Sequence, residues 1–353
     1  KSGENIGNNP IVNQYDTQLY IYTLADGTVI PVTRDFNPSV SQSYWHTDGN
    51  IYLTAVDGDY VHLFRYNVKN KHIAQIECPG DIILSTSVPE KGNRMMYIAS
   101  NVTYPPIIYT MNLNGLETAQ WANPAKQQYE YIVFGEVKDW DYNYKKGTVI
   151  DGRYYLPADF DPNKKYPLLI TQYSGPNSQQ VKNSWGGVNW LNYLAQEGYA
   201  VACIDPRGTA ARGEEFRKCT YMQLGKLESD DMIAAAKWLA EKPFIDKQNI
   251  GIWGWSYGGF MSSLCIMKGN DIFTTAIAVA PVTHYKFYDS IYTERYMRTP
   301  KENEKGYEEN APLNWADKLK GNLLLCHGTA DDNVHVQNTY ELAERLVQAN
   351  KQF

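Results

Sequence analysis

The chain lacks the features that mark several large classes of protein. No apolar run among its 353 residues approaches the roughly 20 that span a bilayer. The opening residues "KSGENIGNNP" lack the basic and then apolar pattern of a signal segment, so we expect any export signal to lie outside this chain. The net charge of -6 comes without basic blocks, which excludes the electrostatic footprint of a nucleic-acid-binding protein.

Cysteine is scarce, and its five positions show no metal-like pairing. Cys203, Cys265 and Cys326 stand inside apolar stretches and are predicted to be buried free thiols. A second possible metal set lies within nine residues, namely His327, Asp331, Asp332 and His335. Because one strand and one tight loop rarely fold round an ion, we expect neither a metal nor a cofactor.

What remains is an ordinary globular composition, with 43% apolar and 20% charged residues. A chain of this length exceeds one compact core, so two domains are expected. We predict them at residues 1–135 and 136–353, where the pattern of apolar residues changes.

A repeat fills the first part. Strand-like runs flank turns at Asp26-Gly27, Lys69-Asn70 and Asn114-Gly115, which gives steps of 43 and 45 residues, and Asn50 and Asn93 repeat the step of 43. This period predicts β-propeller blades. A propeller needs at least about four blades to close, so we expect the chain to begin partway through one. An antiparallel sandwich with evenly spaced hairpins is the alternative.

Short apolar runs alternate with helical patterns in the second part. The runs "PLLITQYSG", "YAVACIDPRG", "NIGIWGWS", "TTAIAVAPV" and "NLLLCHG" suit strands that are buried on both faces. Helices are predicted over "LESDDMIAAAKWLAEK", with acidic residues in its first turn, and "VQNTYELAERLVQAN". Such alternation indicates a mainly parallel sheet covered by helices, and chemistry gathers at the strand ends.

Ser256 stands at one such strand end, within Gly254-Trp255-Ser256-Tyr257-Gly258. This is the nucleophile-elbow pattern, in which a cramped strand-to-helix turn tolerates only glycine two residues either side of the serine. A tight structural turn is the alternative. If Ser256 is the nucleophile, its fold predicts an acid and then a histidine later in the chain.

The acid is predicted at Asp331, in the polar loop after "NLLLCHG", with Asp332 as the competing choice. The histidine is harder to place. His335 follows only four residues later in the same loop, whereas the base normally arrives on a separate loop. We therefore expect the base to lie beyond Phe353, and an α/β-hydrolase sheet without its last strand.

These residues resemble the prolyl oligopeptidase family of serine peptidases, most closely its dipeptidyl peptidase IV branch. The resemblance covers about residues 130 to 353 and is carried by "KKYPLL", "YSGP", "DPRGTAARG", "GWSYGGF", "VAPV", "YDSIYTERYM" and "HGTADDNVH". It implies Ser256 as nucleophile, Asp331 as triad acid, and an oxyanion hole formed by the backbone N–H of Tyr257 and the hydroxyl of Tyr173.

The resemblance also implies a slot of aromatic faces that accepts proline. Tyr288 and Tyr292 match its walls, and their spacing predicts that they share a face of one helix. Asn333 matches an amide that binds a substrate carbonyl. The remaining residues of the slot are Val282, Tyr285 and Val334.

The predicted function is a serine exopeptidase that releases N-terminal dipeptides ending in proline or alanine. The family's paired glutamates, which read the free amino terminus, are absent from residues 1–135. Tripeptidyl, acylaminoacyl, esterase and non-catalytic peptide-binding functions are therefore the alternatives. The family resemblance also implies an exported protein and a homodimer.

Overall fold

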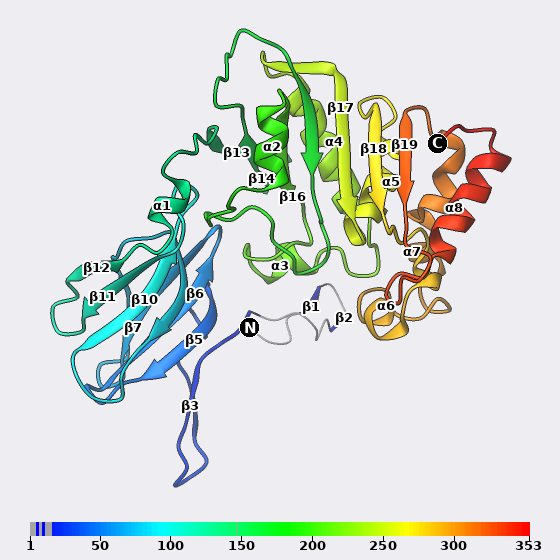
Figure 1. Ribbon diagram of the computed structural model, residues 1–353. Coiled ribbons are helices and arrows are strands. Elements are labelled where there is room, and N and C mark those ends of the chain that lie inside the picture. The colour runs from blue at the N-terminus through cyan, green and yellow to red at the C-terminus, as the bar shows by residue number, and fades with distance from the viewer. Residues whose placement is uncertain (1–4, 7–8, 11–15, 146) are drawn as a thin grey trace.

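The computed structural model describes residues 5–6, 9–10, 16–145 and 147–353, which form an all-β part followed by an α/β part (Figure 1). Two short antiparallel pairs open the chain. The first joins β1 (Asn5–Ile6) to β2 (Asn9–Pro10), and the second joins β3 (Tyr20–Tyr22) to β4 (Val29–Pro31).

Two four-stranded antiparallel sheets make up most of the all-β part, and in each the strands pair in chain order. A single parallel pair, Val61 with Ile82, joins the two sheets. The first sheet contains β5 (Ser39–Trp45), β6 (Asn50–Asp57), β7 (Tyr60–Asn67) and β8 (His72–Ile76). The second contains β9 (Ile82–Ser87), β10 (Arg94–Ser100), β11 (Ile107–Asn112) and β12 (Thr118–Ala122).

The predicted hairpins are confirmed as the pairs β3–β4, β7–β8 and β11–β12. Strand β6 is buried on both faces. Leu53 belongs to a core cluster that the β3–β4 hairpin completes with Ile21. Tyr52 points to the other cluster, with Met95 of the second sheet. The hairpin and the two sheets therefore stack face to face, as the predicted propeller blades do.

A seven-stranded sheet forms the centre of the α/β part, in the order β13-β14-β16-β15-β17-β18-β19. The first two pairs are antiparallel and the remaining four are parallel. Every residue of β16 is buried, which confirms a strand covered on both faces. The strands are β13 (Val137–Lys145), β14 (Thr148–Tyr155), β15 (Tyr166–Thr171), β16 (Ala200–Asp205), β17 (Ile245–Trp255), β18 (Thr275–Val279) and β19 (Asn322–Cys326).

Helices cover this sheet, and short helices lie within the loops that connect its strands (Figure 1). The two central helices, α4 (Lys226–Ala240) and α5 (Tyr257–Lys268), pack against β17 and against each other. The other α-helices are α1 (Lys126–Tyr129), α2 (Trp190–Gln196), α3 (Glu214–Lys218), α6 (Ser290–Met297), α7 (Glu304–Glu309) and α8 (Gln337–Gln348). Two 3₁₀ turns are η1 (Tyr285–Phe287) and η2 (Pro312–Lys318).

The β6–β7 turn of the first blade contacts the long loop that follows β15. The side-chain amide of Gln179 donates to the carbonyl of Gly58 at 3.0 Å and to Oδ1 of Asp59 at 3.2 Å. The backbone N–H of Asn183 donates to the carbonyl of Asp59 at 2.9 Å. These bonds connect the all-β part to a loop that begins at the candidate site.

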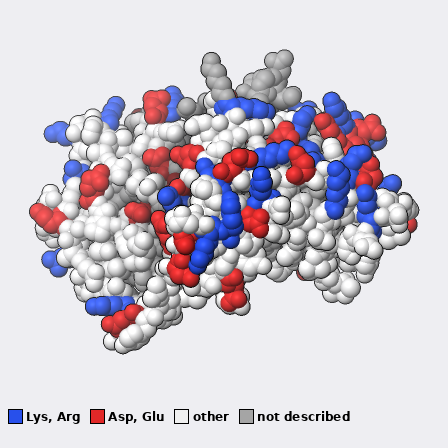
Figure 2. Space-filling view, turned by 90° about the horizontal axis from the view of Figure 1, so that it is seen from above, with Lys and Arg blue, Asp and Glu red and all other residues white. Residues whose placement is uncertain are grey.

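Charges of both signs are interspersed over the face shown in Figure 2, without an extended area of one sign. Among the described residues, none of the helices has the length and apolarity needed to cross a bilayer. Cys203 and Cys265 are buried as predicted, whereas Cys326 is only partly buried, because its strand β19 lies at the edge of the sheet.

Candidate active site

Ser256 lies at a sharp turn between β17 and α5, in a backbone conformation that serine rarely adopts. Its φ is 58° and its ψ is -114°, outside the regions open to most L-residues. Its backbone is held from both sides, because its N–H donates to the carbonyl of Val279 at 2.8 Å and its carbonyl accepts from the N–H of Phe260 at 2.9 Å. Such strain persists only where the surroundings fix it.

Two glycines make this turn possible. A Cβ at Gly254 would lie 2.5 Å from the carbonyl carbon and oxygen of Gly258, and a Cβ at Gly258 would lie 2.6 Å from the carbonyl oxygen of Gln172. Both contacts are with backbone atoms. The steric reason predicted for the glycine pattern is therefore present at Ser256.

Tyr173 follows the end of β15 and lies beside Ser256, whose side chain is near enough to influence the ionisation of the phenol. Burial raises the pKa of the Tyr173 phenol, and the neighbouring Ser256 side chain offsets part of that rise. The phenol therefore stays protonated and can donate. Its ring lies 6.1 Å from that of Tyr257, centroid to centroid, so the two residues predicted for an oxyanion hole are neighbours.

Buried polar side chains on either side of Tyr173 fix its loop. The amide of Gln172 donates to the carbonyl of Gly258 at 2.8 Å and to Oγ of Ser262 at 3.1 Å. The hydroxyl of Ser174 donates back to Gln172 at 2.9 Å. Sequence reasoning missed Gln172 and Ser174, because nothing local to "TQYSGP" reveals that Gln172 bonds to helix α5 and that Ser174 bonds to Gln172.

The sheet brings the loop of Asp331 to the same edge as Ser256. Val279 pairs with Trp255 on one side and with Cys326 on the other, so β17, β18 and β19 end together. The backbone N–H groups of Asn333 and Val334 donate to Oδ1 of Asp331 at 3.0 and 2.9 Å. These bonds hold the pKa of Asp331 below its ordinary value, so it is a carboxylate at neutral pH.

The two histidines of this loop have local partners. Nε2 of His327 donates to the carbonyl of Val334 at 2.7 Å, and Nδ1 shares a hydrogen bond of 2.6 Å with the hydroxyl of Thr339. Nδ1 of the exposed His335 accepts from the N–H of Gln337 at 3.2 Å. Among the described residues, no group of three or more metal-binding side chains is arranged to hold an ion. The position of the base for Ser256 stays a prediction.

Tyr288 and Tyr292 form an aromatic wall, but not on one helix as expected. Tyr288 is extended and ends η1, whereas Tyr292 lies in the first turn of α6. The break arises because the Asp289 side chain caps α6 by accepting from the N–H of Tyr292 at 2.8 Å. The rings nevertheless meet edge to face, with centroids 5.3 Å apart.

The remaining predicted residues lie behind or beside this wall. Val282, Tyr285 and Val334 are buried in the main core of the α/β part, against which Tyr288 and Tyr292 pack. Oδ1 of Asn333 accepts from the Tyr288 hydroxyl at 2.8 Å, so the loop of Asp331 is bonded to the wall. Tyr296 extends the wall, with its ring 4.7 Å from that of Tyr292. Its spacing of four from Tyr292 could have indicated it.

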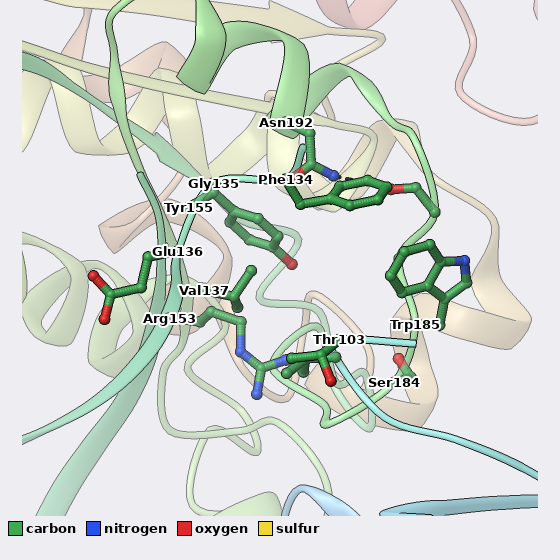
Figure 3. A pocket seen from close by; sticks show the side chains of 13 residues that line it. Thr103, Phe134, Gly135, Glu136, Val137, Arg153, Tyr155, Ser184, Trp185 and Asn192 are labelled. Carbon is green, nitrogen blue, oxygen red and sulfur yellow. Dashed lines mark hydrogen bonds between the residues drawn. The ribbon is translucent and has the colours of Figure 1, made fainter. Parts of the chain in front are cut away.

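A separate cavity of about 300 Å³ lies at the boundary between the blades and the α/β part (Figure 3). Its lining includes Tyr155, Trp185 and Arg153, but none of the candidate site residues. The Arg153 guanidinium donates to the carboxylate of Asp139 at 2.5 and 2.9 Å, and also to the Asn183 side chain and to a backbone carbonyl. Its donors are thus used within the protein.

The fold and the elbow define an α/β-hydrolase domain that follows propeller blades. Comparison with known proteins gives the family. Residues 188–353 match the model of the Prolyl oligopeptidase family. The chain belongs to this family, which confirms the resemblance predicted from its motifs.

Named relatives cover most of the chain. "Probable dipeptidyl peptidase 4" of Aspergillus flavus is 33% identical over 340 residues, which are 93% of this chain and 44% of that protein. Mouse "Prolyl endopeptidase FAP" is 46% identical over 202 residues, 56% of this chain and 26% of that protein. The crystal structure of Porphyromonas gingivalis dipeptidyl peptidase 4 is similar with a TM-score of 0.86 and 37% identity, over 95% of this chain and 48% of that chain. The chain thus spans less than half the length of each relative.

Proposed function

We propose that the protein is a serine exopeptidase that releases N-terminal dipeptides ending in proline or alanine. The observation that carries this proposal is the strained turn that places Ser256 beside Tyr173 and near an aromatic wall. It combines a strained, outward serine with a phenol donor next to a surface that suits a flat, rigid ring.

In the proposed acylation, Oγ of Ser256 attacks the carbonyl carbon of the second residue while its proton passes to a histidine oriented by Asp331. The carbonyl oxygen becomes an oxyanion. The hydroxyl of Tyr173 and the backbone N–H of Tyr257 donate to it, a stabilisation of about 3 kcal/mol for each such donor. The C–N bond then breaks, and the leaving amine takes the proton. Water releases the dipeptide from Ser256 by the reverse sequence.

Substrate recognition is assigned to the wall and to Asn333. The proline ring would lie against Tyr288 and Tyr292. Because Oδ1 of Asn333 already accepts from Tyr288, its amide N–H₂ is left to donate to a substrate carbonyl. That bond would set the register of the peptide relative to Ser256.

The test compares chromogenic glycyl-prolyl and glycyl-alanyl substrates with a simple ester in the full natural protein, with Ser256→Ala as control. A fluorophosphonate probe should label the wild type and leave Ser256→Ala unlabelled. We expect the glycyl-prolyl substrate to be cleaved fastest. Turnover of the ester at an equal or higher rate would instead favour an esterase.

A second candidate is an endopeptidase that cleaves after proline, because a relative that is 46% identical carries that name. An N-acetylated glycyl-prolyl substrate separates the two. Dipeptide release requires a free amine, so acetylation should abolish cleavage by an exopeptidase and leave cleavage by an endopeptidase intact.

A further inference from the structure

Glu228 is a buried acid directly behind the elbow. It lies in the first turn of α4 and is fully buried. Oε1 accepts a hydrogen bond from the hydroxyl of Tyr257 at 2.8 Å, and among the described residues Oε2 has no hydrogen-bond partner. Burial raises the pKa of Glu228 to about 7. A buried acid without a cationic partner is costly to the fold, which indicates a role other than stability.

Tyr257 connects this acid to the candidate site. It is the residue after Ser256 and the first of α5, so its backbone N–H has no partner within the helix and is free to face the site. Its side chain points the other way, into the core, where its ring meets those of Phe260 at 5.1 Å and Tyr285 at 6.3 Å. The bond to Glu228 fixes the far end of this side chain.

The strained backbone of Ser256 explains why the bond between Tyr257 and Glu228 matters. A serine at φ 58° relaxes unless its neighbours prevent it. On the strand side, the bond from Ser256 to Val279 holds the turn. On the helix side, the buried ring of Tyr257 holds the turn. Without Glu228, the Tyr257 hydroxyl would be buried without an acceptor, which favours a shift of the ring toward another partner.

We propose that Glu228 is a positioning residue. Through the Tyr257 hydroxyl it holds the elbow so that the backbone N–H of Tyr257 faces the oxyanion. This inference rests on the proposed function and names a residue that touches no substrate. Its effect falls on the transition state and therefore on kcat rather than on KM.

The experiment measures kcat and KM for the glycyl-prolyl substrate in five variants of the full natural protein. Glu228→Ala removes the acceptor, Glu228→Gln keeps an oxygen there, and Tyr257→Phe removes the donor. Their combination, Glu228→Ala with Tyr257→Phe, tests whether the two act as one unit. Asp230→Ala is the matched control, since it lies on the same turn of α4 with a partly exposed carboxylate. Circular dichroism and the melting temperature report folding.

We expect kcat to fall about 10- to 100-fold in Glu228→Ala and in Tyr257→Phe, with KM changed less than about threefold. The double variant should be no more than about twofold worse than either single variant. Glu228→Gln and Asp230→Ala should stay within about threefold of the wild type.

Two results would overturn the inference. One is wild-type kcat in Tyr257→Phe, and the other is a double variant in which both losses multiply. If Glu228→Ala does not fold, the Tyr257→Phe and Glu228→Gln pair still decides. Failure of the proposed function can be distinguished from failure of this inference, because the wild type itself would then not cleave the glycyl-prolyl substrate.

Discussion

Gly254→Ala tests whether the elbow depends on the close contact between Gly254 and Gly258. The added Cβ would lie 2.5 Å from two backbone atoms of Gly258 and 2.6 Å from a third, where ordinary contact begins at 3.4 Å. The turn must therefore open by about 1 Å, and a displacement of that size can cost roughly 100-fold in catalytic rate. Overpacking of this kind also costs about 1–3 kcal/mol of stability.

We expect kcat/KM for the glycyl-prolyl substrate to fall about 100-fold and the melting temperature to fall by several degrees. Gly251→Ala is the control, because it lies in the same strand but its Cβ would have a close contact only with the flexible side chain of Leu169, at 3.3 Å, and would lie at an ordinary 3.7 Å from the nearest backbone atom. It should stay within about twofold of the wild type. A Gly254→Ala variant with the activity of Gly251→Ala would refute the steric account of the elbow.

Three further predictions follow from buried or bonded side chains. Gln172→Ala leaves Gly258 and Ser262 without their hydrogen-bond donor. It should lower the free energy of unfolding, measured in urea, by about 1–3 kcal/mol. The control Gln180→Ala changes an exposed side chain and should leave the free energy of unfolding unchanged. Asn333→Ala should raise KM for the glycyl-prolyl substrate about tenfold with a smaller change in kcat, because about one hydrogen bond to the substrate is lost; an unchanged KM would exclude Asn333 from substrate binding. Burial raises the pKa of Asp205 to about 6, so its ionised form penalises the folded state and the stability that it contributes falls as pH rises from about 4 to 6. The melting temperature of Asp205→Asn relative to the wild type should therefore increase across that range and reach a plateau near pH 7.

The elements that could be predicted from sequence are those with local causes. The hairpin turns at Asp26-Gly27 and Asn114-Gly115 and the apolar strands of the sheet follow from turn chemistry and residue periodicity. The turn at Ser256 follows from the spacing of its glycines. Each of these depends on neighbours within a few residues.

The features that could not be predicted depend on partners far away in the chain. The acidic residues at the start of the helix predicted where α4 begins, but not that Glu228 and Asp231 are fully buried. Tyr257 meets the first, and Arg207 forms an ion pair of 2.5 Å with the second. No period or turn pattern reports such contacts.

The helix boundary between Tyr288 and Tyr292 was also not predicted, but it has a local cause. The spacing of four residues suggested one continuous helix. Asp289 is a favoured helix-capping residue, and its position directly after Tyr288 could have indicated that α6 begins there. Spacing by four residues describes a shared face only when both residues lie inside one helix.

The hydrogen bonds from Gln179 and Asn183 to the β6–β7 turn limit how far the all-β part can swing away from the α/β part. Hinge opening would break these three hydrogen bonds, at roughly 1 kcal/mol each, and also the ion pair between Asp16 and Arg217 of α3, so the open conformer would be populated by fewer than about one molecule in a hundred. A peptide of the proposed class that could bind only the open conformer would bind at least about a hundredfold more weakly. We therefore expect the proposed peptide substrates to reach Ser256 by a route that leaves this contact between the two parts closed.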